Sequence, residues 1–400
     1  MQKRIYLDYA SATPLDPRVF VRMRSIESKV HANPDSLYKE GREAKKVLEE
    51  ARKISAEILR ARPSEIIFTS GATESNNLAI LGVFSRIKNA HIITSTIEHK
   101  SILEPIRHLE SLGAGVTYIH PNADGVISPK DISKALRPET ALVSIGYANS
   151  EIGTIQPIAE IAKEIRHFRK LPHVGHVGVV FHTDATQAAN YLSLDVQKLG
   201  VDLLTLNSPK VYGPAGIGAL YIKKGTKINP ITFGGGQESG MRSGRELPLL
   251  ASGFAEALKI ADKEREKESK RLTKLRDYFF KKILEIDTEI KINGDRENRL
   301  PNNVNICVKD LDAEFAVYQM DERGIACSSA STCTNLSEDS ISYVVEEIKP
   351  AENCAASSLR FSLGRYTTKS EIDVCLKSLK DVILKQQNLW STSPSSKRSS

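Results

Sequence analysis

Two stretches decide the fold of this chain: His182-Thr183-Asp184-Ala185-Thr186-Gln187 and Leu206-Asn207-Ser208-Pro209-Lys210. Each lies where a hydrophobic run ends, so a charged side chain, Asp184 or Lys210, comes just beyond a predicted buried strand. Ligands of open α/β sheets bind outside the carboxyl ends of the strands, and the two side chains are expected to meet there. This pair suits pyridoxal phosphate, because the lysine can form a Schiff base with its aldehyde while the aspartate keeps its ring nitrogen protonated.

Other hydrophobic runs are also followed by polar residues, and they alternate with helical patterns, as expected of an α/β protein with a mainly parallel sheet. A long helical pattern at about 246–285, rich in Lys and Glu, is predicted to lead into a second domain. Polar residues follow the predicted strands, and we expect them to converge at one edge of the sheet. The strands are predicted at 66–69, 91–94, 141–145, 179–182 and 203–206, and the converging residues are Thr73, His99, Asn149, Asp184 and Lys210.

Length and composition indicate an ordinary globular protein. The 400 residues exceed the size at which one core stops growing, which favours a large domain with a smaller one attached. No apolar stretch approaches the ~20 residues of a membrane span, so a membrane protein is not expected. The net charge of +7 comes from 56 basic and 49 acidic residues spread along the chain. Because no basic run is interleaved with aromatic residues, a solvated surface is favoured over nucleic-acid binding.

The five cysteines form an odd number without a CxxC pair, which argues against a disulfide framework and against a zinc site, so no metal is expected. This pattern favours a reducing, cytoplasmic location. The N-terminus lacks the apolar core of a secretory signal, and no targeting segment is expected before the fold. The polar residues 386–400 are predicted to form a disordered tail.

Each candidate motif also has a purely structural interpretation. Gly71-Ala72-Thr73 opens a predicted helix whose amides and dipole favour a phosphate, but ordinary strand-to-helix turns look the same. His99 could stack on an aromatic cofactor and exchange protons, or it could cap a helix. Asp184 and Gln187 are also spaced like a helix N-cap and its partner. The glycines after Lys210 allow the backbone to turn around a ligand, although a lone lysine before a turn is usually solvated.

Seven motifs lie in order along the chain: Ser70–Asn76, Glu98–Ser101, Glu151–Pro157, Asp184–Gln187, Lys210–Gly218, Gly234–Glu238 and Ser358–Arg365. Together they resemble the cysteine desulfurases, which are pyridoxal-phosphate enzymes of the class V aminotransferase type. The resemblance runs from Tyr6 to about Leu384. It implies an α/β protein of PLP-dependent fold type I. A large domain at 15–257 would hold a mainly parallel mixed sheet, and residues 1–14 and 258–385 would form a smaller α+β domain.

The resemblance implies a role for each matching residue. Lys210 would carry the Schiff base, Asp184 would partner the pyridine nitrogen, and His99 would stack on the ring. Arg360 would bind the substrate carboxylate through two parallel hydrogen bonds. The other implied cofactor contacts are Gln187 with the ring hydroxyl and Thr73 with the amide of Ala72 on the phosphate.

Four positions depart from the family pattern. Asn207 and Pro209 replace a serine and a histidine that help to hold the phosphate, and Pro209 cannot donate a hydrogen bond. Arg245 stands where a threonine commonly reaches across a homodimer to the partner's phosphate, which an arginine could bind through charge. Ser150 replaces an asparagine that contacts the ring hydroxyl and the substrate, and Asn149 lies one position away. These changes affect the hold on the cofactor, so we still expect a working enzyme, with weaker cofactor affinity as one consequence.

Cys333 is the candidate sulfur acceptor, within a segment at about 327–342 that resembles the family's mobile loop. Cys327 competes for this role, but it follows Gly324-Ile325-Ala326, which is predicted to end a buried strand. Cys333 lies among Ser and Thr residues, as an exposed nucleophile requires. The polar residues that follow Cys333 make this segment long, and in this it resembles the loop of the subgroup that delivers sulfur directly to scaffold and carrier proteins.

The activity implied is conversion of L-cysteine to L-alanine, with a persulfide formed on Cys333 and passed to acceptor proteins of iron-sulfur assembly or tRNA thiolation. Lys210 would remove the Cα proton, and His99 would carry the proton of the substrate thiol. The alternatives are another class V PLP aminotransferase, a selenocysteine lyase, or a degenerate, non-catalytic homologue. A homodimer is also implied by the resemblance.

Overall fold

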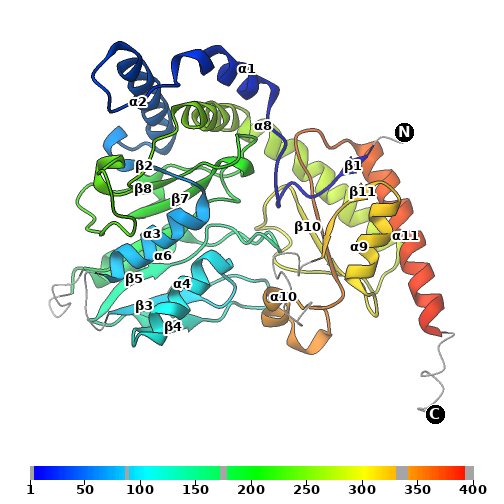
Figure 1. Ribbon diagram of the computed structural model, residues 1–400. Helices are drawn as coiled ribbons and strands as arrows, with labels where there is room; N and C mark the ends of the chain where they lie inside the picture. The colour runs from blue at the N-terminus through cyan, green and yellow to red at the C-terminus, as the bar shows by residue number, and fades with distance from the viewer. Residues whose placement is uncertain (1–3, 86–89, 172–177, 330–340, 392–400) are drawn as a thin grey trace.

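A seven-stranded sheet forms the centre of the larger part of the computed structural model, which describes residues 4–85, 90–171, 178–329 and 341–391. Its strand order is β2-β8-β7-β6-β5-β3-β4, and within this sheet only β8 runs opposite to the other strands. The predicted mainly parallel mixed sheet is therefore confirmed (Figure 1). The strands are β2 (Ile66–Thr69), β3 (His91–Ser95), β4 (Gly115–Ile119), β5 (Thr140–Ser144), β6 (Val180–Asp184), β7 (Leu203–Asn207) and β8 (Gly218–Ile222).

Helices cover both faces of this sheet, so its strands are buried on two sides. One face packs against α3 (Ala72–Phe84) and α4 (Lys100–Ser111) through a hydrophobic cluster that includes Leu78 and Ile106. The other face packs in a larger cluster with the remaining helices of this part of the chain. These are α1 (Pro17–Ile26), α2 (Lys39–Leu59), α5 (Pro129–Ala135), α6 (Ile158–Phe168), α7 (Val196–Leu199) and the first part of α8 (Pro248–Ile286).

A second hydrophobic core forms around two small sheets. The pair β1-β11 and the sheet β12-β13-β10-β9 pack with the end of α8 and with α9 (Ala313–Glu322) and α11 (Lys369–Ser391), while α10 (Tyr343–Ile348) forms a smaller cluster. Figure 1 shows α8 running from the large sheet into this part, and its Phe254 and Phe279 belong to different cores. The predicted boundary at 257/258 falls inside this helix. The strands are β1 (Ile5–Tyr6), β9 (Lys291–Ile292), β10 (Asn303–Cys307), β11 (Ile325–Ala326), β12 (Ser328–Ser329) and β13 (Ser358–Ser362).

The cysteine spacing argued against a disulfide framework, but the structure contains a disulfide. Cys307 and Cys354 form a disulfide with a Cα–Cα distance of 5.3 Å, although they are 47 residues apart in sequence. Cys307 ends β10, and the chain after α10 returns beside it, which spacing along the sequence does not reveal. Cys327 and Cys375 are free and buried.

The predicted tail at 386–400 begins too early, because α11 continues to Ser391. Lys, Gln and Leu are good helix formers, and adding residues to an existing helix is easier than starting one. The predicted disordered residues 392–400 lie outside the described part of the chain. Within the residues that the structure describes, no helix is long and apolar enough to cross a membrane.

Candidate functional site

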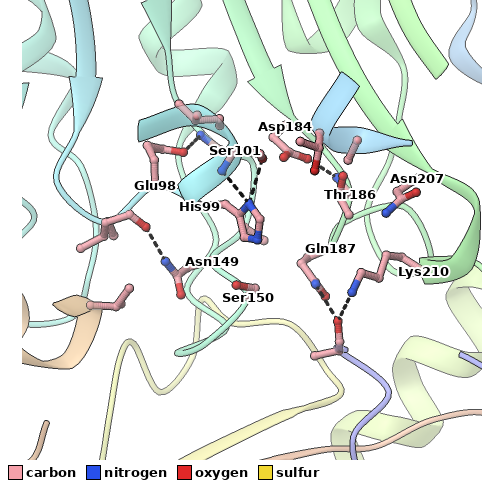
Figure 2. A pocket seen from close by; sticks show the side chains of 18 of the residues that line it. Glu98, His99, Ser101, Asn149, Ser150, Asp184, Thr186, Gln187, Asn207 and Lys210 are labelled. Carbon is pink, nitrogen blue, oxygen red and sulfur yellow. Dashed lines mark hydrogen bonds between the residues drawn. The ribbon is translucent and has the colours of Figure 1, made fainter. Parts of the chain in front are cut away.

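One cavity of about 250 Å³ opens at the carboxyl ends of the central strands, where the sequence predicted that polar residues converge. Figure 2 shows Asp184, Asn207 and Lys210 on one side of it and His99, Asn149 and Ser150 on the other. The predicted site residues that line the cavity are Ala72, Thr73, His99, Asn149, Ser150, Asp184, Gln187, Asn207, Lys210 and Arg360.

Lys210 ends a short 3-10 turn that follows β7, so the strand holds its backbone and its side chain reaches the cavity. Its Nζ donates a hydrogen bond of 2.7 Å to the carbonyl of Ala10 and another to the carbonyl of Ser11. The Nε2 of Gln187 also donates to the Ala10 carbonyl, at 3.0 Å (Figure 2). The N-terminal segment therefore forms part of the lysine's surroundings, and the solvated interpretation of Lys210 is wrong.

Asp184 is the last residue of β6, and its carboxylate accepts two hydrogen bonds of 2.8 Å. One comes from the amide N–H of Thr186 and the other from the side chain of Asn76 in α3. No helix begins directly after Asp184, so the interpretation of this residue as a helix N-cap is wrong. Its carboxylate instead lies at the cavity, where a protonated ring nitrogen would find an anionic partner.

His99 fits both interpretations made from the sequence. It is the N-cap of α4, where its Nδ1 accepts a 3.1 Å hydrogen bond from the amide of Ser101, and its ring also lines the cavity. Burial lowers the pKa of His99, and the charges of Lys210 and Lys100 lower it further against the opposing effect of Asp184. The ring is therefore mainly neutral at neutral pH.

Glu98 is a cavity residue that the sequence did not identify as functional. Its carboxylate accepts from the hydroxyl of Ser95 at 2.6 Å and from the amide of Gly146 at 2.9 Å. Burial raises the pKa of Glu98 to about 7, although these hydrogen bonds lower it. The Glu98 carbonyl accepts a 2.6 Å bond from the hydroxyl of Tyr343, so the start of α10 is attached beside His99.

Arg360 lies in β13 and enters the cavity from the second core, only 5% exposed. Its guanidinium donates to the carboxylate of Asp8 at 2.9 Å, to the hydroxyl of Ser11 at 3.0 Å and to the carbonyl of Ser150 at 3.2 Å. Its Nε is buried and makes no hydrogen bond among the described residues. A guanidinium held in place at the wall of the cavity is suited to bind a small carboxylate.

The turn at the start of α3 fits a phosphate. Ala72 and Thr73 are the first two helical residues, so their amide groups belong to the unsatisfied N-terminal set that favours anions. Gly218 in β8 allows the strand to approach this turn, because a Cβ there would lie 2.8 Å from the Cα of Gly71. With Asp184 and Lys210 lining the same cavity, the residues present fit pyridoxal phosphate.

Some predicted site residues have another position or further contacts. Arg245 is exposed and does not line this cavity. The side-chain oxygen of Asn149 accepts from the amides of Glu151 and Ile152, and its Nδ2 donates to the carbonyl of Ile97, so this amide also serves to hold its own loop. Cys333 lies outside the described residues. Cys327 is buried, as the sequence predicted, and burial raises its thiol pKa to about 12, which makes it a poor nucleophile.

Comparison with known proteins agrees with this site. Residues 5–375 match the model of the aminotransferase class-V family. The chain is 41% identical over 391 residues to the cysteine desulfurase IscS of Dictyoglomus turgidum, covering 97% of each protein.

Solved structures give the same result. A NifS-like protein superposes with a TM-score of 0.87 at 31% identity, covering 96% of this chain and 100% of the other. SspA in complex with cysteine gives a TM-score of 0.77 at 35% identity, with 91% of this chain and 100% of the other covered. The chain therefore belongs to the aminotransferase class-V family and, within it, to the pyridoxal-phosphate-dependent cysteine desulfurases.

Proposed function

We propose that this protein removes sulfur from L-cysteine with Lys210, His99 and Cys333 as its catalytic residues. The observation that supports this most directly is the meeting of Lys210, Asp184, His99 and Arg360 at one cavity. When bound, pyridoxal phosphate would supply an aldehyde that forms a Schiff base and an electron sink for the charge left at Cα. The chain's own residues would bind, orient and move protons around it.

Each residue has a task that its surroundings support. Lys210 would hold the cofactor and then, as a free amine, take the Cα proton. Asp184 would partner the ring nitrogen, and Gln187 would contact the ring hydroxyl. Arg360 would bind the substrate carboxylate, which fixes where the sulfur lies. His99 would stack on the ring and reach the substrate thiol.

The further cofactor contacts follow from where each residue lies. Thr73 and the amide of Ala72 would hold the phosphate at the start of α3, with Asn207 at the end of β7. Asn149 and Ser150 would lie at the ring and substrate side of the cavity, where the Ser150 carbonyl already contacts Arg360.

Sulfur would leave through Cys333. Its thiolate attacks the sulfur of the bound cysteine, the bond between that sulfur and Cβ breaks, and the three-carbon remainder takes up protons to become alanine. One cysteine and one thiol give one alanine and one persulfide, so the atoms balance without an added oxidant. A protein acceptor then takes the terminal sulfur, and a scaffold for iron-sulfur assembly or a tRNA-thiolation protein fits the long segment around Cys333.

Two further proposals concern the assembly and its location. We propose a homodimer in which the exposed Arg245 of each subunit contacts the phosphate of the other, and sedimentation of the wild type and an Arg245→Thr variant, with cofactor retention after dialysis, tests this. The proposed location is the cytoplasm. Thiol titration of protein alkylated inside cells tests it, because a reducing compartment would leave Cys307 and Cys354 unpaired.

The decisive experiment incubates the purified protein with pyridoxal phosphate, L-cysteine and a thiol reductant, and measures sulfide and alanine. Equal amounts of both are expected, and unequal amounts would contradict the proposal. Lys210→Ala should abolish both products and the cofactor's visible absorption band, whereas the matched exposed variant Lys198→Ala should retain them. The activity of an aminotransferase would survive the substitution Cys333→Ala. A selenocysteine lyase would prefer selenocysteine as its substrate, and a non-catalytic homologue would give no visible absorption band with pyridoxal phosphate.

A further inference from the structure

A chain of hydrogen bonds joins Asp184 to His99 through two buried residues, Asn76 and Ser101, for which the sequence indicated no role of their own. Nδ2 of Asn76 donates to Oδ2 of Asp184 at 2.8 Å and to Oγ of Ser101, also at 2.8 Å. The Ser101 hydroxyl lies 2.8 Å from Nδ1 of His99, and the Ser101 amide donates to the same nitrogen at 3.1 Å. Asn76 has no exposed surface, and Ser101 is 8% exposed.

The orientation of the Asn76 amide follows from its neighbours. If its oxygen and nitrogen were exchanged, an amide oxygen would face the Asp184 carboxylate at hydrogen-bond distance, and two acceptors would repel each other. In the observed orientation both N–H groups are used, while Oδ1 is buried without a partner among the described residues. Leaving Oδ1 unpaired costs about 1–3 kcal/mol. The amide keeps this orientation because its two N–H groups then serve the two acceptors, the Asp184 carboxylate and the Ser101 hydroxyl.

The remaining protons follow from the Ser101 amide, which donates to Nδ1 of His99 and makes that nitrogen an acceptor. Ser101 has one hydroxyl proton, and because its oxygen accepts from Asn76, that proton is free to point at Nδ1 of His99. Nδ1 thus accepts from both the hydroxyl and the amide of Ser101. A neutral imidazole has one donor and one acceptor nitrogen, so its proton is on Nε2. Figure 2 shows this second nitrogen turned away from Ser101, toward the open part of the cavity near Ser150.

We infer that Asn76 and Ser101 are positioning residues that hold His99 neutral with its proton on Nε2, so that it meets the substrate sulfur as a hydrogen-bond donor. This inference deepens the proposed function and rests on its assignment of His99 to the reaction. Before Nε2 could accept the thiol proton, the ring proton would have to move to Nδ1 against two donors. His99 therefore donates to the substrate sulfur and stabilises its thiolate form, which differs from the proton-carrying role that the resemblance implied for it.

Nitrogen NMR of the holoenzyme with ¹⁵N-labelled histidine measures this directly, since protonated and unprotonated ring nitrogens differ widely in chemical shift. A His99→Gln variant identifies the His99 signals. We expect less than about a tenth of the neutral rings to carry their proton on Nδ1, because one hydrogen bond of ordinary strength already gives such a bias. A wild-type ring protonated on Nδ1 overturns the inference.

Two variants test the role of the positioning residues. Asn76→Asp would present an acceptor to the Ser101 hydroxyl, turn its proton away from His99 and raise the fraction of Nδ1-protonated ring several-fold. Ser101→Ala removes the hydroxyl donor while keeping the amide, and should shift the proton in the same direction by less. If the Asn76→Asp variant does not fold, the His99 signals of Ser101→Ala alone test the inference. Unchanged His99 signals in every variant that folds would refute the assignment.

A matched control separates positioning from general stability. Asn293 is also fully buried, donates from Nδ2 to Asn305 and Ser358 at 2.8 Å and leaves its Oδ1 unpaired among the described residues, but it lies in the second core. Asn293→Asp should lower the Tm and leave the His99 signals unchanged. Because the NMR signals do not depend on turnover, a failure of this inference is distinct from a failure to produce sulfide and alanine.

Discussion

The hydroxyl of Ser342 donates a 2.6 Å hydrogen bond to the carboxylate of Glu151, which attaches the start of α10 to the segment beside the cavity residue Ser150. The same hydroxyl caps α10 by accepting from the amide of Val345. Both side chains are buried, with Glu151 9% and Ser342 1% exposed. The contact joins α10 to the segment that follows Ser150 through a single titratable group, and residues of both, Ile152 and Val345, belong to one small hydrophobic cluster.

We predict that Glu151→Gln makes the protein less sensitive to alkaline pH. Burial raises the pKa of Glu151 from 4.5 to about 7, more than the hydrogen bond from Ser342 lowers it. The neutral acid stabilises the fold fully below about pH 4.5, and this contribution is lost as the pH rises through about 7. The difference amounts to about 3 kcal/mol.

Chemical denaturation at pH 5 and pH 8 measures this effect. The free energy of unfolding of the variant, relative to the wild type, should increase between the two values, because glutamine stays neutral and still accepts from Ser342. Glu346→Gln, an exposed position on the same helix, serves as the control and should show no such difference. Equal pH dependence of the wild type and Glu151→Gln would show that Glu151 does not titrate in this range.

Arg360→Lys should weaken substrate binding with little effect on cofactor retention. Lysine keeps the charge but cannot form two parallel bonds to a carboxylate, and charge-assisted hydrogen bonds contribute about 1.5–3 kcal/mol, or roughly 10- to 150-fold in kcat/KM. Steady-state kinetics with L-cysteine should show most of this loss in KM. Arg24→Lys, at an exposed ion pair, is the matched substitution, and equal kinetics for both variants would exclude Arg360 from the substrate site.

The two cysteine candidates are expected to behave oppositely. Cys333→Ser should reduce sulfide release to background while the cofactor spectrum still responds to L-cysteine. Cys327→Ala should lower the Tm, because Cys327 belongs to the second hydrophobic core, and should keep sulfide production. Mass spectrometry of the protein after a brief reaction should find the extra sulfur on Cys333. Finding it on Cys327 would reverse the assignment.

The disulfide between Cys307 and Cys354 should stabilise the protein only in the absence of reductant. Closing a loop of this length restricts the unfolded chain by about 4 kcal/mol in the chain-entropy model. A reductant should therefore lower the Tm of the wild type, and it should leave the Tm of Cys307→Ala unchanged. Scanning calorimetry with and without reductant makes the comparison, and a wild-type Tm that does not respond would mean that the pair is not bonded in solution.

The sequence predicted those features of the fold whose signal lies in a short stretch of neighbouring residues. The ends of β6 and β7 were predicted within one or two residues, because buried parallel strands appear as continuous hydrophobic runs. The edge strand β4 was missed, since most of its residues are partly exposed and the run is broken by Thr117. Asp184 and Lys210 came together as expected, because the ends of neighbouring strands meet at one edge.

Signals that depend on tertiary contacts were not available from the sequence alone. Asn76 sits in a helix that is apolar on most sides, and only the packed structure shows that its amide is buried between Asp184 and Ser101. The contacts of Asp8 and Tyr343 link segments more than two hundred residues apart. The resemblance located Arg360, but it did not reveal the three groups that hold it.

The contacts of the N-terminal segment determine when this enzyme can mature during synthesis. Ala10, whose carbonyl receives the Lys210 amine, is itself held by a 2.9 Å hydrogen bond from its amide to the hydroxyl of Ser362, and Ile5 pairs with Ile325. A nascent chain that still lacks β13 has no Ser362 to hold the amide of Ala10, although Gln187 can already donate to the Ala10 carbonyl. The surroundings of the cofactor lysine are thus completed only after nearly the whole chain has left the ribosome. This site therefore forms late in co-translational folding.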